Sequence, residues 1–282
     1  MTGIAQPHAH DHDLSERQRI EAAVYDERVR ASLAALSDDD LRVSAAQPPY
    51  PNREHIDFLD FTLSRLGPLS RARVLEVGSG TGALSVYLAL QGAMVTGIDV
   101  SAETVAVARR RAEVNGVADR TDFRAVPIEG LDDPTGTYDA IIGNQVLHHF
   151  ELDVAMPNIG RLLRPGGRAL FCEPVMLLPD WTRSLRGSRV VTRFAPRRVD
   201  TPTERSVSPR DVRAIRHTFP AVRLHPFQLL ARLQNFVALG DRAFAALEGV
   251  DRILLRIPAL RGLCRFVVFE VAAQNAMEEV KR

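Results

Sequence analysis

The 282-residue chain is poor in lysine: Lys281 is the only one, so nearly all of its positive charge is arginine. This absence excludes mechanisms that need an internal lysine, such as a pyridoxal Schiff base or a tyrosine-lysine dehydrogenase pair. An arginine bias of this kind reflects genome base composition more readily than selection at one site. We therefore give little weight to any single arginine cluster.

Cysteine and long apolar runs are also scarce. Cys172 and Cys264 are too few for a disulfide framework or a four-thiolate zinc cluster, and we expect no metal site. No apolar run reaches the ~18 residues of a membrane-spanning helix, and residues 1–13 lack the basic start and apolar stretch of a signal peptide. Three alternating histidines in that terminus suit a disordered tail better than a metal site. We therefore expect a cytoplasmic protein.

The formal net charge is only +1, which creates no whole-protein field to attract nucleic acid or a membrane. The strongest local charge is a run of six arginines between Trp181 and Val199 that contains no acidic residue. It permits three interpretations: a solvated loop, a site for an anionic acceptor, or contact with a membrane surface. The solvated loop is the simplest. We expect no nucleic-acid partner, because no RNA-binding module is appended, and the oligomeric state stays open.

Short apolar stretches alternate with amphipathic ones over residues 71–175, a pattern typical of a parallel sheet covered by helices on both faces. The amphipathic stretches predict helices near 82–90, 101–114 and 151–163. The apolar stretches predict five strands, at 74–77, 94–99, 122–126, 138–143 and 168–175.

The flanking regions follow other patterns. Residues 14–70 contain helical spacing at 14–36 and 53–66, which predicts an N-terminal helical cap. The irregular stretch 176–207 is predicted to form a lid. Residues 208–282 are expected to complete the fold with a helix that starts at Ser208, a strand at 221–225, a helix with Phe244, Leu247, Val250 and Leu254 on one face, and a last strand at 266–271.

A glycine-rich turn, Gly78-Ser79-Gly80-Thr81-Gly82, follows the first predicted strand. Glycine lets the chain turn sharply and lets backbone N–H groups approach a ligand that a side chain would push away. The second predicted strand ends at Asp99, about 20 residues past Gly78, a spacing that places a carboxylate against ribose hydroxyls. The two features together indicate a site for an adenosine-containing ligand.

These residues resemble the class I S-adenosylmethionine-dependent methyltransferases, particularly the small-molecule enzymes of quinone biosynthesis. Three further segments occur in the order of that family: Tyr138–Gly143, Leu147–Phe150 and Leu162–Gly167. The likeness covers residues 72–175 closely and the rest only by architecture. It implies an α/β fold, a Rossmann-like doubly wound sheet of seven strands whose last strand is antiparallel, with helical insertions after strand five and between the last two strands.

The resemblance also implies S-adenosylmethionine as the cofactor. Its methionine end is expected near Glu76, Gly78, Ser79, Gly80 and Gly82, its ribose on Asp99, its adenine beside Val100, Val126 and Ile128, and its sulfonium beside Asn144 and Gln145. Many members of that family carry an acid after the third strand, and this acid hydrogen-bonds the adenine amino group. In this chain Glu129 or a backbone carbonyl is expected to make that hydrogen bond instead. Three of these residues keep alternative roles: Gly82 in helix packing, Asp99 in capping the helix that follows it, and Glu76 in bonding backbone amides of the turn.

Methyl transfer from a sulfonium is an in-line displacement, so the protein chiefly positions the reactants and excludes water. A base helps when the acceptor is a hydroxyl, and His148 and His149 are candidates because they follow the fourth strand at the ligand-binding rim. Their alternative is to cap and pack the next helix. Tyr25, Tyr50 and Glu173 are the candidate acceptor contacts, each with packing as its alternative.

The sequence therefore predicts a methyltransferase that acts on a small-molecule acceptor, with O-methylation slightly favoured over N- or C-methylation, and the arginine run permits an anionic acceptor. Two alternatives stay open. Gly78, Gly80 and Ala83 formally satisfy the dinucleotide-binding pattern of a nicotinamide oxidoreductase. A noncatalytic protein that binds S-adenosylmethionine would show the same motifs.

Overall fold

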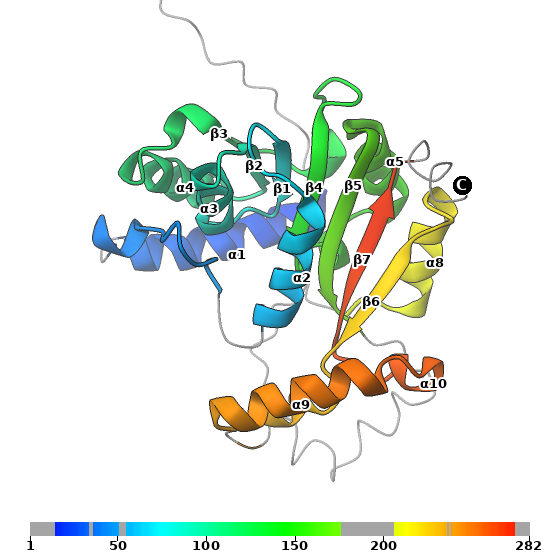
Figure 1. The fold of residues 1–282 in the computed structure, drawn as a ribbon. Helices are drawn as coiled ribbons and strands as arrows, with labels where there is room; N and C mark the ends of the chain where they lie inside the picture. Colours follow the sequence, from blue (N-terminus) through cyan, green and yellow to red (C-terminus); the bar gives the residue numbers. More distant parts are fainter. Residues whose placement is uncertain are drawn as a thin grey trace, which may run out of the picture.

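The computed structural model describes residues 15–33, 36–50, 55–175, 206–235, 237 and 239–273. Their centre is a seven-stranded sheet in the order β3-β2-β1-β4-β5-β7-β6, in which β7 runs antiparallel to both of its neighbours (Figure 1). The predicted α/β sheet with an antiparallel last strand is therefore confirmed. The strands are β1 (Arg73–Val77), β2 (Met94–Asp99), β3 (Thr121–Ala125), β4 (Tyr138–Asn144), β5 (Leu163–Pro174), β6 (Arg223–Phe227) and β7 (Phe266–Ala272).

Helices cover both faces of this sheet, which explains why its central strands are apolar on both sides. Helices α2 (Ile56–Leu66), α3 (Ala83–Leu90) and α4 (Ala102–Val114) pack on one face. Helices α5 (Leu152–Leu162) and α8 (Pro209–Thr218) pack on the other. Short 3-10 turns connect several elements: η1 (Asp39–Leu41), η3 (Ala118–Arg120), η4 (Ile128–Gly130), η5 (Leu147–His149) and η6 (Ala231–Asn235).

Two strands differ from the prediction by more than one residue. Strand β5 begins at Leu163, five residues early, because Leu163 already pairs with Tyr138 before a register shift. Strand β6 covers 223–227 rather than 221–225, since Val222 is still bonded to Phe219 in the preceding turn. Proline within β6 is tolerated because β6 is the edge strand, where a missing N–H interrupts no ladder.

Helix α1 (Glu16–Leu33) is the N-terminal helix predicted at 14–36, and it packs against α4 beside the carboxyl ends of the strands. The hydroxyl of Ser101, which caps α4, donates to the carboxylate of Asp26 on α1. This contact holds α1 over the rim where a doubly wound sheet binds its ligands.

A small lobe formed by η6, α9 (Asp241–Leu254) and α10 (Pro258–Arg261) connects β6 to β7. The predicted face of α9 is buried only in part: Phe244 is buried, together with Glu248 and Asp251, whereas Val250 is 43% exposed. The reason is that the Asp251 carboxylate accepts hydrogen bonds from three consecutive backbone amides, those of residues 229–231. An acid that accepts hydrogen bonds from buried backbone amides is itself buried, even where the apolar spacing of the helix predicts an exposed position.

The predicted tail 1–13 and most of the predicted lid 176–207, including the arginines between 181 and 199, lie outside the described residues. Within the part of the chain that is described, no helix is long and apolar enough to cross a membrane.

Candidate cofactor and acceptor site

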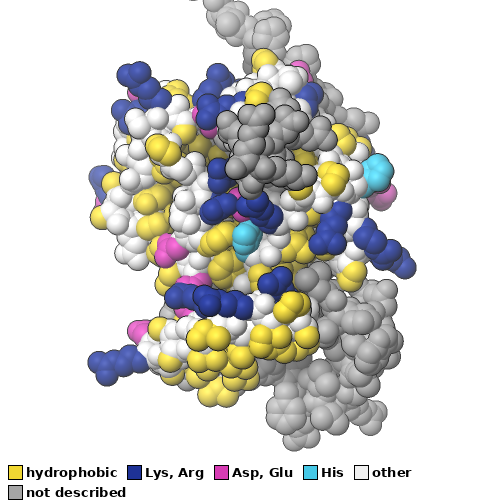
Figure 2. Space-filling model, turned by 45° about the vertical axis from the view of Figure 1, so that its right-hand side comes forward, with side chains coloured by type: hydrophobic (Ala, Val, Ile, Leu, Met, Phe, Trp, Pro, Cys, Tyr) yellow, Lys and Arg dark blue, Asp and Glu magenta, His cyan; other side chains and the backbone are white. Residues whose placement is uncertain are grey.

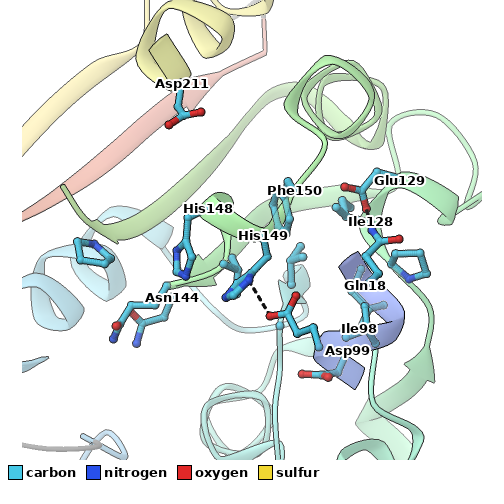
Figure 3. Close-up of a pocket in the computed structure, with 18 of the residues that line it drawn as sticks. Gln18, Ile98, Asp99, Ile128, Glu129, Asn144, His148, His149, Phe150 and Asp211 are labelled. Carbon is cyan, nitrogen blue, oxygen red and sulfur yellow. Dashed lines mark hydrogen bonds and ion pairs between the residues drawn. The ribbon is translucent and has the colours of Figure 1, made fainter. Parts of the chain in front are cut away.

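A cavity of about 1000 Å³ opens at the carboxyl ends of the parallel strands, between the sheet, α1 and α8. In the close-up of Figure 3, Asp99, Gln18 and Glu129 lie at one end and Asp211 at the other, with His148 and His149 between them. Most of the residues predicted for the site line this cavity. They are Tyr25, Gly78, Gly80, Asp99, Val100, Val126, Ile128, Asn144, Gln145, His148 and His149.

The glycine turn after β1 has a left-handed backbone, with φ of 69° at Gly78 and 51° at Gly80. A Cβ built on Gly78 would lie 2.2 Å from Cγ1 of Val146, whereas a Cβ on Gly80 would meet no heavy atom within 4 Å. Gly78 is thus required by close packing, and Gly80 leaves backbone open to the cavity.

The carboxylate of Asp99 joins two backbone turns while it faces the cavity. One oxygen accepts the N–H of Gly80 at 3.0 Å, and the other accepts the N–H of Ser101 at 3.0 Å. Burial raises the pKa of this carboxyl above its ordinary value, against the lowering effect of these backbone hydrogen bonds. Each oxygen has a second lone pair, so Asp99 can still accept hydrogen bonds from a ligand.

Three residues predicted for the cofactor do not line the cavity. Gly82 packs: a Cβ there would lie 2.8 Å from Cβ of Ala108. Ser79 is buried beside the turn. Glu76 is 6% exposed and accepts a 2.5 Å hydrogen bond from the hydroxyl of Ser85, and burial raises the pKa of its carboxyl to about 8. Its partner is therefore a side chain of α3 rather than an amide of the turn.

The predicted adenine end is apolar on one side and polar on the other. Val126 and Ile128 are buried in the cavity wall. Glu129 accepts a 3.0 Å hydrogen bond from Nε2 of Gln18 on α1 and a 2.8 Å bond from the backbone N–H of Glu151. Gln18 was missed by the sequence analysis, because a glutamine among the charges of an amphipathic helix carries no distinguishing signal.

Asn144 is the last residue of β4 and Gln145 follows it, at the middle of the cavity. The side-chain oxygen of Asn144 is buried and accepts no hydrogen bond from the described residues. Gln145 has a left-handed backbone with φ of 57°, and its Nε2 lies 3.0 Å from Nε2 of His55. A buried, unsatisfied acceptor at a cavity surface is a ready partner for a ligand donor.

Glu173 is fully buried on β5 and organises the turn that carries the histidines. One carboxylate oxygen accepts the backbone N–H groups of Val146 and Leu147 at 2.6 and 2.7 Å, and the other lies 2.7 Å from Nδ1 of His148. Glu173 does not line the cavity. It holds the ring of His148 in place through Nδ1, which leaves Nε2 to act on a ligand.

His149 has a second acidic neighbour, Glu21 of α1. A carboxylate oxygen of Glu21 lies 2.7 Å from Nδ1 of His149, as an ion-pair contact without hydrogen-bond geometry (dashed in Figure 3). The two histidine rings lie 3.9 Å apart, centroid to centroid. Glu21 also lines the cavity and was missed by the sequence analysis, because its partner is far away in the chain.

The two predicted acceptor tyrosines have different positions. Tyr25 lines the cavity from α1, with the guanidinium carbon of Arg28 5.5 Å from its ring centroid. Tyr50 does not line it: its hydroxyl donates to Asp60, and its ring packs beside the apolar cluster around Phe58.

The cavity is polarised between its two ends. Acidic side chains line the end near β2 and α1, namely Glu21, Asp99 and Glu129. Arginines line the other end, at the start of α8 and before β7: Arg210, Arg213 and Arg265. The one acid beside them, Asp211, accepts from the backbone N–H and hydroxyl of Ser208 in a capping box. The helix start at Ser208 was predicted from the sequence, but its place in the site was not.

Known proteins share the central part of this chain. Residues 74–167 match the family model described as a methyltransferase domain. Ubiquinone biosynthesis O-methyltransferase of Methylocella silvestris is 37% identical over 147 residues, 51% of this chain and 56% of that protein. The homologous enzyme of Xylella fastidiosa is 37% identical over 141 residues, 49% of this chain and 56% of that protein. The chain thus matches a little over half the length of these relatives.

Solved structures match over a longer range. Geranyl diphosphate C-methyltransferase from Streptomyces coelicolor A3(2), in complex with geranyl diphosphate and S-adenosyl-L-homocysteine, covers 92% of this chain and 98% of its own, with a TM-score of 0.60 and 17% identity. The [4+2]-cyclase SpnF covers 92% and 97%, with a TM-score of 0.57 and 20% identity. At these identities the likeness shows the fold alone. Together with the domain match, it shows that residues 74–167 are similar to a methyltransferase domain and that the chain shares the fold of these solved proteins.

Proposed function

We propose that this chain transfers a methyl group from S-adenosylmethionine to a hydroxyl group of a small molecule. The observation that supports this most directly is the composition of one cavity wall. It joins an adenosine-type turn at Gly78 and Asp99 to two histidines, each with a carboxylate within 2.7 Å. The relatives named for ubiquinone biosynthesis support oxygen as the methylated atom.

The residues of the cavity fit S-adenosylmethionine, which when bound supplies an electrophilic methyl group on a sulfonium. Asp99 keeps free lone pairs for ribose hydroxyls, and the open backbone at Gly80 admits a ligand at close range. The unsatisfied oxygen of Asn144 suits the ammonium of the methionine end. Val126 and Ile128 offer an apolar surface for adenine.

His148 is the preferred base of the proposed reaction. Its Nδ1 faces Glu173, so Nε2 is the atom that would take the proton from an acceptor hydroxyl. The buried carboxylate of Glu173 stabilises the positive charge that the ring gains, and it fixes the ring orientation. His149 with Glu21 is a second candidate that the geometry leaves in reach of the same cavity.

The basic end of the cavity favours an acceptor with an anionic group. Arg210 and Arg213 project from the first turns of α8, and both are exposed at the cavity rim. Guanidinium groups bind carboxylates and phosphates in pairs of hydrogen bonds, and backbone N–H groups at a helix start add to that attraction. The charge separation would orient such an acceptor with its anion away from the acidic cofactor end.

Calorimetric titration separates this proposal from its two alternatives. The protein should bind S-adenosylmethionine and its demethylated product with micromolar-range affinity, and nicotinamide cofactors should not bind. Asp99→Ala should weaken binding at least ~10-fold, because it removes the ribose acceptor. Asp119→Ala, an exposed acid in η3, is the matched control and should leave affinity unchanged. Tight binding of a nicotinamide cofactor would contradict the assignment.

Turnover with a panel of phenolic acceptors then tests catalysis. His148→Ala should lower the methylation rate while cofactor affinity stays intact, and His149→Ala should have the smaller effect. Cofactor binding without methylation of any acceptor in the panel would favour the noncatalytic alternative. Equal rates for the wild type and both histidine variants would remove the base from the mechanism.

A further inference from the structure

The lobe between β6 and β7 carries most of the exposed large apolar side chains of the described residues. Nine large apolar side chains are exposed in that part of the chain, and six of them belong to this lobe. Isolated apolar side chains on a surface are ordinary, but a cluster of them marks an interaction site. The six are Leu233, Val237, Val250, Ile253, Ile257 and Leu263.

Helix α9 carries large apolar side chains on its outer face as well as on its inner one. Its outer face carries Val250 and Ile253, which are 43% and 64% exposed, and the same three-and-four spacing continues to Ile257 beyond the helix. Its inner face buries Phe244 together with two acids, Glu248 and Asp251. A globular protein normally turns the apolar stripe of a helix inward and its acids outward. The additional apolar stripe on the outer face of α9 therefore indicates that this face has a partner.

The charges around this face are of one sign. Among the exposed side chains described for residues 229–263, four are arginines and Asp241 is the one acid. Figure 2 shows hydrophobic side chains along the lower edge of the lobe, directly below a group of basic ones. The four arginines are Arg242, Arg252, Arg256 and Arg261.

We infer that the outer face of α9 docks onto the surface of an anionic lipid bilayer. An apolar stripe bordered by basic side chains matches the boundary between acyl chains and anionic headgroups. A second copy of the chain fits less well, because two such faces would bring arginines against arginines. The anionic phosphates of lipid headgroups instead neutralise these arginines.

The position of the lobe connects this surface to the cavity. Strands β6 and β7 meet the lobe at the edge of the sheet where the parallel strands end, as Figure 1 shows. Arg265 and Phe266, which follow the lobe directly, line the cavity. Docking through α9 therefore holds the cavity rim near the bilayer surface, within reach of an acceptor dissolved in lipid.

Vesicle co-sedimentation tests the inference without cofactor or acceptor, so its outcome is independent of the proposed function. The full chain should bind vesicles of equimolar phosphatidylcholine and phosphatidylglycerol, and bind pure phosphatidylcholine much less. The double variant Val250→Glu/Ile253→Glu should lower the partition coefficient at least ~10-fold. Val154→Glu, on α5 and 49% exposed in the wild type, is the matched control and should bind as the wild type does.

Arg242→Gln/Arg256→Gln should weaken binding to the anionic vesicles only. Every variant keeps the arginine run 181–199, so adsorption through that run would survive in the α9 variant and overturn the inference. The inference would also fail if the wild type were a dimer that Val250→Glu/Ile253→Glu dissociates, with no vesicle binding. A lower unfolding temperature of that variant with unchanged vesicle binding would show that the chain itself covers the face.

Discussion

The two sides of the cavity are built differently. The sheet side, from β1 to β5, is held by backbone: glycine turns, strand ladders, and carboxylates that accept N–H groups, as Asp99 and Glu173 do. The cap side, from α1 and α8, is held by contacts between side chains, such as Gln18 with Glu129 and Glu21 with His149. Backbone contacts depend on local geometry, which sequence motifs encode. Side-chain contacts between distant segments depend on tertiary packing, which motifs do not encode.

The largest expected effect comes from Gly78→Ala on the sheet side. A Cβ there lies 2.2 Å from Val146 and also requires a left-handed backbone, so we expect a stability loss of roughly 3 kcal/mol or more and loss of measurable cofactor binding. Urea unfolding and titration calorimetry measure the two effects. Gly80→Ala has only the backbone cost, about 1 kcal/mol, yet should also weaken cofactor binding, because its methyl group enters the cavity.

Adding Val146→Ala to Gly78→Ala should recover part of the lost stability, since the clash is removed and the backbone cost stays. If Gly78→Ala and Gly80→Ala were equally stable, tight packing at Gly78 would not be what requires the glycine.

A second prediction concerns pH and the buried acid of β1. The pKa of Glu76 is about 8 in the folded chain against an ordinary 4.5, because burial disfavours its charge. Between these two pKa values the Glu76 carboxyl is ionised in the unfolded chain and protonated in the folded chain. The free energy of unfolding therefore falls as the pH rises toward 8. Glu76→Gln should therefore be more stable than the wild type at about pH 8, by on the order of a few kcal/mol, and the gap should close toward about pH 5.

Urea unfolding of both proteins at the two pH values measures this difference. A gap that does not change with pH would show that Glu76 ionises alike in the folded and unfolded chains.

The smallest expected effect contrasts the two histidine partners. Glu173→Gln, on the sheet side, should lower turnover at least ~10-fold and shift the pH–rate profile, because it changes the group that holds His148 and two backbone amides. Glu21→Gln, on the cap side, should lower turnover only about 2- to 5-fold, since its contact with His149 lacks hydrogen-bond geometry. Cofactor affinity serves as the control for both variants.

A larger loss of turnover in Glu21→Gln than in Glu173→Gln would show that the cap side contributes more to catalysis than the sheet side, and would identify His149 as the base.

The sequence predicted the sheet side well. All seven strands were placed within a few residues, and the turn at Gly78, Asp99 and the histidines after β4 meet in one cavity. These features follow from local rules: apolar runs for strands, glycine for a left-handed turn, and a carboxylate at a strand end.

The cap side and the lobe could not be predicted in the same way. In the sequence, Glu21 is one of several charged residues of an amphipathic helix, which are ordinarily exposed. Its contact with His149 forms only when α1 packs on the rest of the chain. The acids of α9 face inward because Asp251 accepts hydrogen bonds from backbone amides of another segment, so the apolar spacing of the helix predicted only part of its buried face. Glu173 was expected near the acceptor, but it lies behind the histidine instead.

The left-handed backbone of Gln145 has a consequence for how this protein can be engineered. A residue with a side chain is less stable in that conformation than glycine, by about 1–2 kcal/mol, yet here it lies between β4 and the turn that carries the histidines. Searches for thermostable variants would therefore select glycine at this position. The gain would come with loss of the amide that contacts His55, so heat resistance and precise placement of the rim compete at a single residue.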